Sequence, residues 1–153
     1  MRVSEPCARA IRRARKIARF LGSVTLMPEH FMIAMLKTKN AATRFLRRAG
    51  IVLKEVRNAC LKDIHQSKDY RGMEPCRSDS WNTVMGRAAT LAQNGKRNSI
   101  GIFDVFAAFA ETNGIVECVF EACHAAYSAI RQFLTNLVKQ EQEYANPLAP
   151  STT

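Results

Sequence analysis

Apolar side chains recur every three or four positions along residues 1–65, the spacing of amphipathic helices. Ser4 is a suitable cap for the first helix, Pro6 fits its first turn, and Gly22 marks its end. Three more helices are expected over about residues 28–36, 41–48 and 53–65. In the second of the four, Pro28-Glu29-His30 directly precede a run of apolar residues.

The same pattern restarts after residues 66–77, a polar segment with a glycine and a proline that is expected to be a linker. Ser78 repeats the cap, and a fifth helix presents an apolar face from Trp81 to Ala92. Further helices are expected over about residues 102–110, 115–123 and 127–140, followed by a flexible tail over 142–153.

The two halves align without a gap when the chain is shifted by 74 positions, so that residues 3–64 meet 77–138. Few residues are identical, but apolar helix faces coincide, as Ile17 with Leu91 and Val56 with Ile130. The predicted fold is therefore all-α, with two tandem four-helix repeats, residues 1–65 and 78–141. We expect them to pack as one pseudo-twofold eight-helix domain.

Charge is distributed unevenly along the chain. The formal net charge is +10, and residues 1–76 hold 17 Lys and Arg against 6 Asp and Glu. No apolar stretch approaches the roughly 20 residues that span a bilayer, and no signal-peptide core follows the basic N-terminus. Five cysteines without paired spacing suit a reducing compartment. We expect a cytoplasmic protein without a membrane partner.

Several segments together resemble the N-terminal domain of Clp-type ATP-dependent unfoldases, most closely the ClpA type. They are ARKIARFLG, PEHFMIAML and AATRFLRRAGI in the first half, and SWNTVMGRAATLAQNGKRNSIGIFDVFAAFA in the second. The resemblance covers about residues 3–138 and implies a double Clp-N motif that is not an enzyme. Such a domain docks an adaptor, a protein substrate or the unfoldase itself, and modulates Clp-dependent proteolysis.

Nucleotide hydrolysis is rejected from the sequence. A phosphate loop needs a glycine-rich turn followed by Lys and then Ser or Thr. The chain has one Gly-Lys pair, Gly95-Lys96, and Arg97 follows it. We therefore expect no nucleotide and no other cofactor.

Three interpretations apply to Pro28-Glu29-His30. The first is a plain helix start, with proline in the first turn and an acid near the positive helix end. The second comes from the resemblance, since some family members bind protein ligands, including phosphorylated arginine, through these caps and acids. It implies partner binding at Ser4, Glu29 and His30, and at Ser78 in the second repeat, where Phe103 and Asp104 replace the acid and the histidine.

Metal binding is the third interpretation, and the spacing disfavours it because adjacent helical residues point about 100° apart. Cys118, Cys123 and His124 also lack the spacing of a metal site or a nucleophile, and buried free thiols are expected there. We predict no metal site and no catalytic residue.

The first helix carries a basic face opposite its apolar one, made by Arg9, Arg12, Arg13, Lys16 and Arg19. A solvated surface is the plainest interpretation of such a face. Docking to an acidic protein is the functional one, with charge steering the association. Nucleic-acid binding is the alternative, although no aromatic residues interleave the basic ones and no recognition helix is evident.

Overall fold

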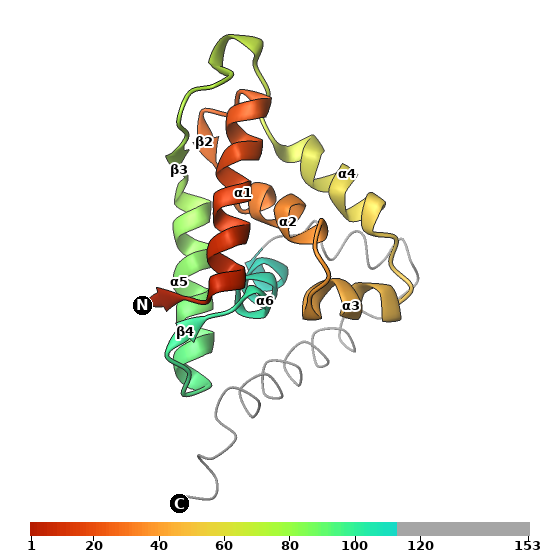
Figure 1. The fold of residues 1–153 in the computed structure, drawn as a ribbon, viewed down its shortest axis with the longest axis vertical. Coiled ribbons are helices and arrows are strands. Elements are labelled where there is room, and N and C mark those ends of the chain that lie inside the picture. The colour runs from red at the N-terminus through yellow and green to blue at the C-terminus, as the bar shows by residue number, and fades with distance from the viewer. Residues whose placement is uncertain (113–153) are drawn as a thin grey trace, which may run out of the picture.

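The computed structural model describes residues 1–112, and within them the fold is mostly helical (Figure 1). The α-helices are α1 (Glu5–Leu21), α2 (Pro28–Leu36), α3 (Ala41–Arg48), α4 (Leu53–Asp63), α5 (Asp79–Asn94) and α6 (Ile102–Thr112). A short 3₁₀ helix, η1, covers Lys68–Tyr70. The strands are β1 (Arg2–Val3), β2 (Thr25–Leu26), β3 (Cys76–Arg77) and β4 (Ser99–Ile100).

Helix α1 begins and ends where its sequence predicts. The Ser4 hydroxyl accepts a hydrogen bond from the Cys7 amide, and Gly22 closes the helix with a left-handed φ of 71°. Its predicted apolar stripe is confirmed, because Ala10, Ala14 and Ala18 are all buried. α5 repeats this start, with the Ser78 hydroxyl accepting from the Trp81 amide.

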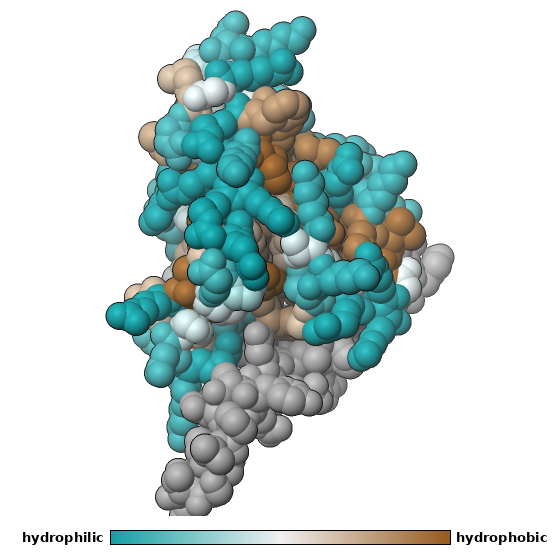
Figure 2. Space-filling view, viewed as in Figure 1, coloured by the Kyte–Doolittle hydropathy of each residue, from teal (hydrophilic) through white to brown (hydrophobic). Residues whose placement is uncertain are grey.

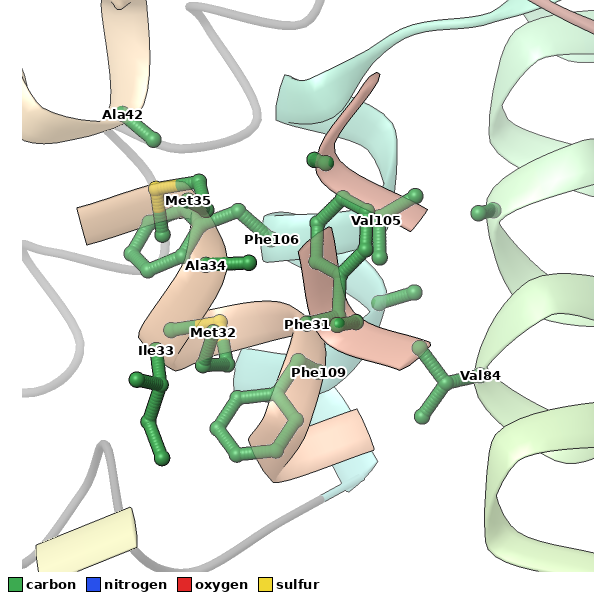
Figure 3. Close-up of a cluster of buried hydrophobic side chains, with 14 of the residues drawn as sticks. Phe31, Met32, Ile33, Ala34, Met35, Ala42, Val84, Val105, Phe106 and Phe109 are labelled. Atoms are coloured by element: carbon green, nitrogen blue, oxygen red, sulfur yellow. The ribbon is translucent and has the colours of Figure 1, made fainter. Parts of the chain in front are cut away.

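The core lies around α2 and α6, the two most apolar helices. Every residue of α2 from Pro28 to Met35 is buried, and α6 is buried from Phe103 to Ala110. Figure 3 shows Phe31, Met32, Phe106 and Phe109 meeting between them. Aromatic edges join neighbouring elements, as where Phe31 of α2 meets Trp81 of α5 at a centroid distance of 6.3 Å.

The four short strands are absent from the all-α prediction. β1 pairs in parallel with β4, and β2 pairs in parallel with β3, so each pair joins the two halves of the chain. Two residues are too few to produce an alternating pattern. Because these strands form through contacts between segments far apart in sequence, no local signal could have revealed them.

The expected linker, residues 66–77, contains η1 and β3 and is held against the C-terminal end of α1. The amide of Ser67 donates to the Leu21 carbonyl at 3.1 Å, and the amide of Gly72 donates to the Arg19 carbonyl at 3.0 Å. The contact is close, because a Cβ placed on Gly22 would lie 1.7 Å from the Ser67 oxygen.

Corresponding elements of the two halves recur at the 74-residue spacing found in the sequence. The elements β1, α1, β2 and α2 correspond, in this order, to β3, α5, β4 and α6, and α3, α4 and η1 lie between the two sets. The helices expected over 115–123 and 127–140, the tail, and Cys118, Cys123 and His124 all lie outside the described residues.

Candidate functional site

The strand pairs decide which helix starts lie together. The Ser4 amide donates to the Ile100 carbonyl at 2.9 Å, which places Ser4 beside the start of α6. The Ser78 hydroxyl donates to the Leu26 carbonyl at 2.9 Å, which places Ser78 beside the start of α2. The structure therefore sets Ser78, not Ser4, next to the helix that carries Glu29.

Ser4 also lines a cleft of about 510 Å³ where α1, α3 and α6 begin. Its other polar lining residues include Asn40, Asn98 and Ser99. Phe103 lines the same cleft, at the position where the first half has Glu29. This cleft therefore lacks the acid that the resemblance associates with a helix-start site.

His30 is fully buried and takes part in a hydrogen-bond chain. The Met27 amide donates to His30 Nδ1 at 2.9 Å, so the ring proton lies on Nε2. Nε2 then donates to the Ser23 hydroxyl at 3.0 Å, which in turn donates to the His65 carbonyl at 2.7 Å. Burial lowers the pKa of His30 to about 4, so its ring is neutral at pH 7. His30 thus ties the start of α2 to the segment after α4.

Glu29 is 3% exposed and one of its carboxyl oxygens, Oε1, has no hydrogen-bond partner within the described residues. Burial is the main cause that raises its pKa above the usual value, and nearby Asp63 adds to it. The Cys60 thiol is buried as well, and its burial, followed by the nearby carboxylates of Glu29 and Asp63, raises its pKa to about 12. Glu29 and His30 therefore lie beneath the surface, and Cys60 is an unreactive thiol.

The predicted basic face of α1 divides into two rows. Arg9, Arg13 and Lys16 are exposed, and within residues 1–112 none of them has a carboxylate at ion-pair distance. The teal surface over α1 in Figure 2 marks this hydrophilic face. The remaining predicted residues are paired: Arg12 Nη2 lies 3.1 Å from Glu5 Oε1, and Arg19 Nη1 lies 2.7 Å from Glu74 Oε2.

Glu74 belongs to the connecting segment, residues 66–77, and joins that segment to the basic face of α1. Besides Arg19, it contacts Arg15, whose Nη1 lies 3.2 Å from Oε1. The hydrogen bond from Arg19 is the largest cause that lowers the pKa of Glu74. Part of the basic face thus contacts the connecting segment through ion pairs that remain exposed to solvent.

A second cleft, of about 620 Å³, lies between α1 and α5 and is called the α1–α5 cleft below. Its apolar lining includes Val3, Ile11, Trp81 and Met85. The ionisable side chains that line it are all basic: Arg12, Arg15 and Arg77. Of these, Arg12 and Arg15 also pair with the exposed carboxylates of Glu5 and Glu74, which do not line the cleft. An apolar surface with an exclusively basic border suits an acidic peptide that also carries apolar side chains.

Sequence reasoning found Arg12 but missed the cleft. Trp81 was expected in the core, and it is indeed only 3% exposed, yet it also forms part of the cleft lining. Arg77 lies in β3, within the expected linker, and nothing local placed it opposite α1. The 74-residue repeat was the available signal, because it pairs Ile11 with Met85 on equivalent helices.

Within residues 1–112, no group of three or more His, Cys, Asp or Glu is placed to hold a metal ion. None of the helices in that part of the chain has the length and apolarity to cross a membrane.

Comparison with known proteins decides the family. Residues 2–111, most of the chain, match the family described as the Clp repeat (R) N-terminal domain. This chain belongs to that family. A search of curated protein sequences gave no match.

Solved structures of Clp-type N-terminal domains have the same fold. The Hsp104 N-terminal domain from Candida albicans has a TM-score of 0.74 at 17% identity, covering 90% of this chain and 91% of that one. The N-terminal domain (1–163) of the ClpV1 ATPase from the E. coli EAEC Sci1 T6SS has a TM-score of 0.68 at 20% identity, covering 90% and 85%. A ClpV N-domain in complex with a VipB peptide has a TM-score of 0.66 at 15% identity, covering 89% and 94%. At these identities the likeness concerns the fold.

Proposed function

We propose that this Clp repeat domain is a non-enzymatic protein-interaction module. It binds an adaptor, a protein substrate or a Clp-type unfoldase, and thereby modulates Clp-dependent unfolding and proteolysis. The observation that carries the proposal is the α1–α5 cleft, with its apolar lining and all-basic border. A related domain, the ClpV N-domain, forms a complex with a VipB peptide, which supports a peptide as the bound species.

Binding in the cleft divides between apolar and charged contacts. Burying a partner's side chain against Trp81 and Met85 supplies affinity of about 25 cal/mol per Å² of apolar surface removed from water. Arg12, Arg15 and Arg77 orient the partner's carboxylates. The exposed row of Arg9, Arg13 and Lys16 raises the rate of encounter with an acidic partner.

The proposal includes the full arrangement expected from the sequence. Two four-helix repeats, residues 1–65 and 78–141, form one pseudo-twofold eight-helix domain of a cytoplasmic protein. Ser4 and Ser78 are further partner-contacting positions at the helix starts. Glu29 and His30 contribute to partner binding indirectly. Both side chains are buried, and they hold the start of α2 in its conformation.

The test is capture of partners by the full chain from nuclease-treated lysate at physiological salt, followed by direct binding to the purified candidates. We expect enrichment of a Clp unfoldase, its peptidase or an adaptor. The variant Arg12→Glu/Arg77→Glu should lose that binding, whereas Lys39→Glu/Lys62→Glu, two exposed lysines that do not line the cleft, should retain it. Absence of any Clp component, or equal binding by both variants, contradicts the proposal.

The exposed row on α1 supports a second candidate, binding of nucleic acid. Each phosphate neutralised by Arg9, Arg13 or Lys16 would steepen the dependence of affinity on salt. Anisotropy of a labelled mixed-sequence DNA duplex, measured against salt concentration, tests it. Binding that persists at physiological salt and is lost in Arg9→Gln/Arg13→Gln/Lys16→Gln favours nucleic acid. Binding confined to low salt reflects general charge attraction.

A further inference from the structure

Gly86 lies in the middle of α5 without a backbone reason for glycine. Within the described residues, positive φ angles occur at Gly22, Gly50, Gly72 and Lys96, and Gly86 is not among them. Glycine inside a helix is less favourable than alanine by about 0.8–1.0 kcal/mol. Any ordinary residue would adopt this conformation, so the missing side chain needs another explanation.

Packing inside the described chain does not supply that explanation. A Cβ built on Gly86 meets no atom within 4 Å, whereas one built on Gly22 would collide with the backbone of Ser67. Gly86 is exposed and lines the α1–α5 cleft. The open space at this position, called the Gly86 notch below, is therefore a recess in the cleft wall formed by α5.

Two pairs of equivalent positions on the facing walls of the cleft differ in both size and charge. At the 74-residue spacing, Gly86 corresponds to Arg12 and Ala89 corresponds to Arg15. All four line the cleft. At these two positions α5 is thus small and neutral, whereas α1 is long and basic, although the two helices are equivalent in the fold. A partner seated between them meets a recess on the side of α5 and positive charge on the side of α1.

We propose that the Gly86 notch receives one bulky apolar side chain of a partner's acidic peptide segment, whose carboxylates face Arg12, Arg15 and Arg77. The inference rests on the proposed function and adds a specificity-determining position to it. Charge identifies the occupant, because every ionisable side chain in the lining is basic, and Arg77 has no carboxylate at ion-pair distance within residues 1–112. Arg12 and Arg15 pair with Glu5 and Glu74, two exposed carboxylates that a partner's acids would replace. Ile11, Trp81 and Met85 line the same cleft and supply apolar surface that would remove the inserted side chain from water.

The test pairs variants of Gly86 with synthetic peptides in a double-mutant cycle. The probe is a short fluorescein-labelled peptide of glutamates and leucines without tryptophan, with one matched peptide in which leucines become alanines and another in which glutamates become glutamines. Affinity is read by fluorescence polarisation. Emission from Trp81, the one tryptophan in the chain, reports occupancy of the cleft with unlabelled peptide.

Gly86→Leu fills the notch and should keep the fold, because the site is open and leucine favours helix. Thr83→Leu is the matched control, since Thr83 is exposed on the same helix and does not line the cleft. For the native chain and for Thr83→Leu, the leucine peptide should bind about tenfold or more tighter than the alanine peptide. In Gly86→Leu that preference should disappear, because its leucine occupies the notch.

Three results overturn the inference. Equal weakening of the leucine and alanine peptides by Gly86→Leu shows that the notch does not select the side chain. An unchanged affinity for the glutamine peptide shows that the occupant is not acidic. A concentration-dependent dimer in sedimentation that Gly86→Leu converts to a monomer assigns the cleft to a second copy of this chain.

The two proposals fail in different ways. Suppose that a Clp component is captured through Arg12 and Arg77, but the preference for the leucine peptide over the alanine peptide is the same in the native chain and in Gly86→Leu. The proposed function then stands and the notch inference fails. If neither the peptides nor any Clp component binds the native chain, the proposed function fails and the inference fails with it.

Discussion

His30 and Asp104 stand at equivalent positions 74 residues apart, and each accepts a hydrogen bond from the backbone amide three residues before it. The Met27 amide donates to His30 Nδ1 at 2.9 Å, and the Gly101 amide donates to Asp104 Oδ2 at 2.8 Å. Their partners correspond as well, because Ser23 binds His30 and Arg97 forms a bidentate pair with Asp104. One half of the chain thus uses a neutral pair where the other uses a buried ion pair.

The buried His30 should make stability depend on pH. Its pKa is about 4 in the folded chain against 6.5 for an ordinary histidine. Between those pH values the unfolded chain binds a proton that the folded chain does not, so the free energy of unfolding falls as the pH is lowered through this window. The total loss is about 3 kcal/mol, which denaturant unfolding at a series of pH values will measure.

His30→Gln is the variant that isolates this effect. Glutamine keeps an acceptor at the third helical position and does not titrate. The difference in stability between the native chain and His30→Gln should narrow or reverse as the pH falls from 6.5 to 4. His65→Gln, at an exposed histidine, should follow the native profile. Parallel curves for the native chain and His30→Gln would refute the prediction.

The buried pair of Arg97 and Asp104 should be replaceable by the pair found in the other half. Arg97→Ser alone leaves the Asp104 carboxylate buried without its partner and should cost about 3–5 kcal/mol in unfolding free energy. Arg97→Ser/Asp104→His recreates the neutral Ser23–His30 arrangement and should recover part of that loss. Chemical denaturation of both variants measures this, and a double variant no more stable than the single one counts against equivalence.

Glu74 should control the local stability of residues 66–77 more than the stability of the whole fold. Glu74→Gln weakens the contacts with Arg15 and Arg19, and the Gly72 amide, which donates to the Arg19 carbonyl, should exchange with solvent faster. The unfolding free energy should change little because the ion pairs are exposed. Glu5→Gln, which breaks the separate exposed pair with Arg12, should leave the exchange at Gly72 unchanged.

Gly22 and Lys96 occupy equivalent left-handed turns after α1 and α5, with φ of 71° and 55°. Gly22→Ala should destabilise by about 2 kcal/mol or more, because its Cβ adds backbone strain and meets the Ser67 carbonyl. Lys96→Gly should stabilise by about 1 kcal/mol, because it removes the strain of a side chain in this conformation. Thermal unfolding measures both, and shifts of the same sign in the two variants would contradict the argument.

Local signals predicted most of the helices correctly. The cap at Ser4, the apolar stripe through Ala14 and the stop at Gly22 all act within a few residues, so they define α1 without any tertiary contact. The start of α5 at Ser78 was found in the same way. The position of the basic face on α1 was also predicted from the sequence, because the 3.6-residue period of a helix assigns each residue to a face.

The candidate site needed the tertiary structure. The exchange of strands between the halves places Ser4 beside α6 and Ser78 beside α2, and brings Arg77 opposite α1 in the cleft. Each of these pairings joins residues more than 50 positions apart, and each strand is only two residues long. Sequence by itself determined the helices and their charge, because those follow from short-range hydrogen bonding and spacing. The burial of Glu29 and His30, and the cleft between α1 and α5, were decided by long-range packing.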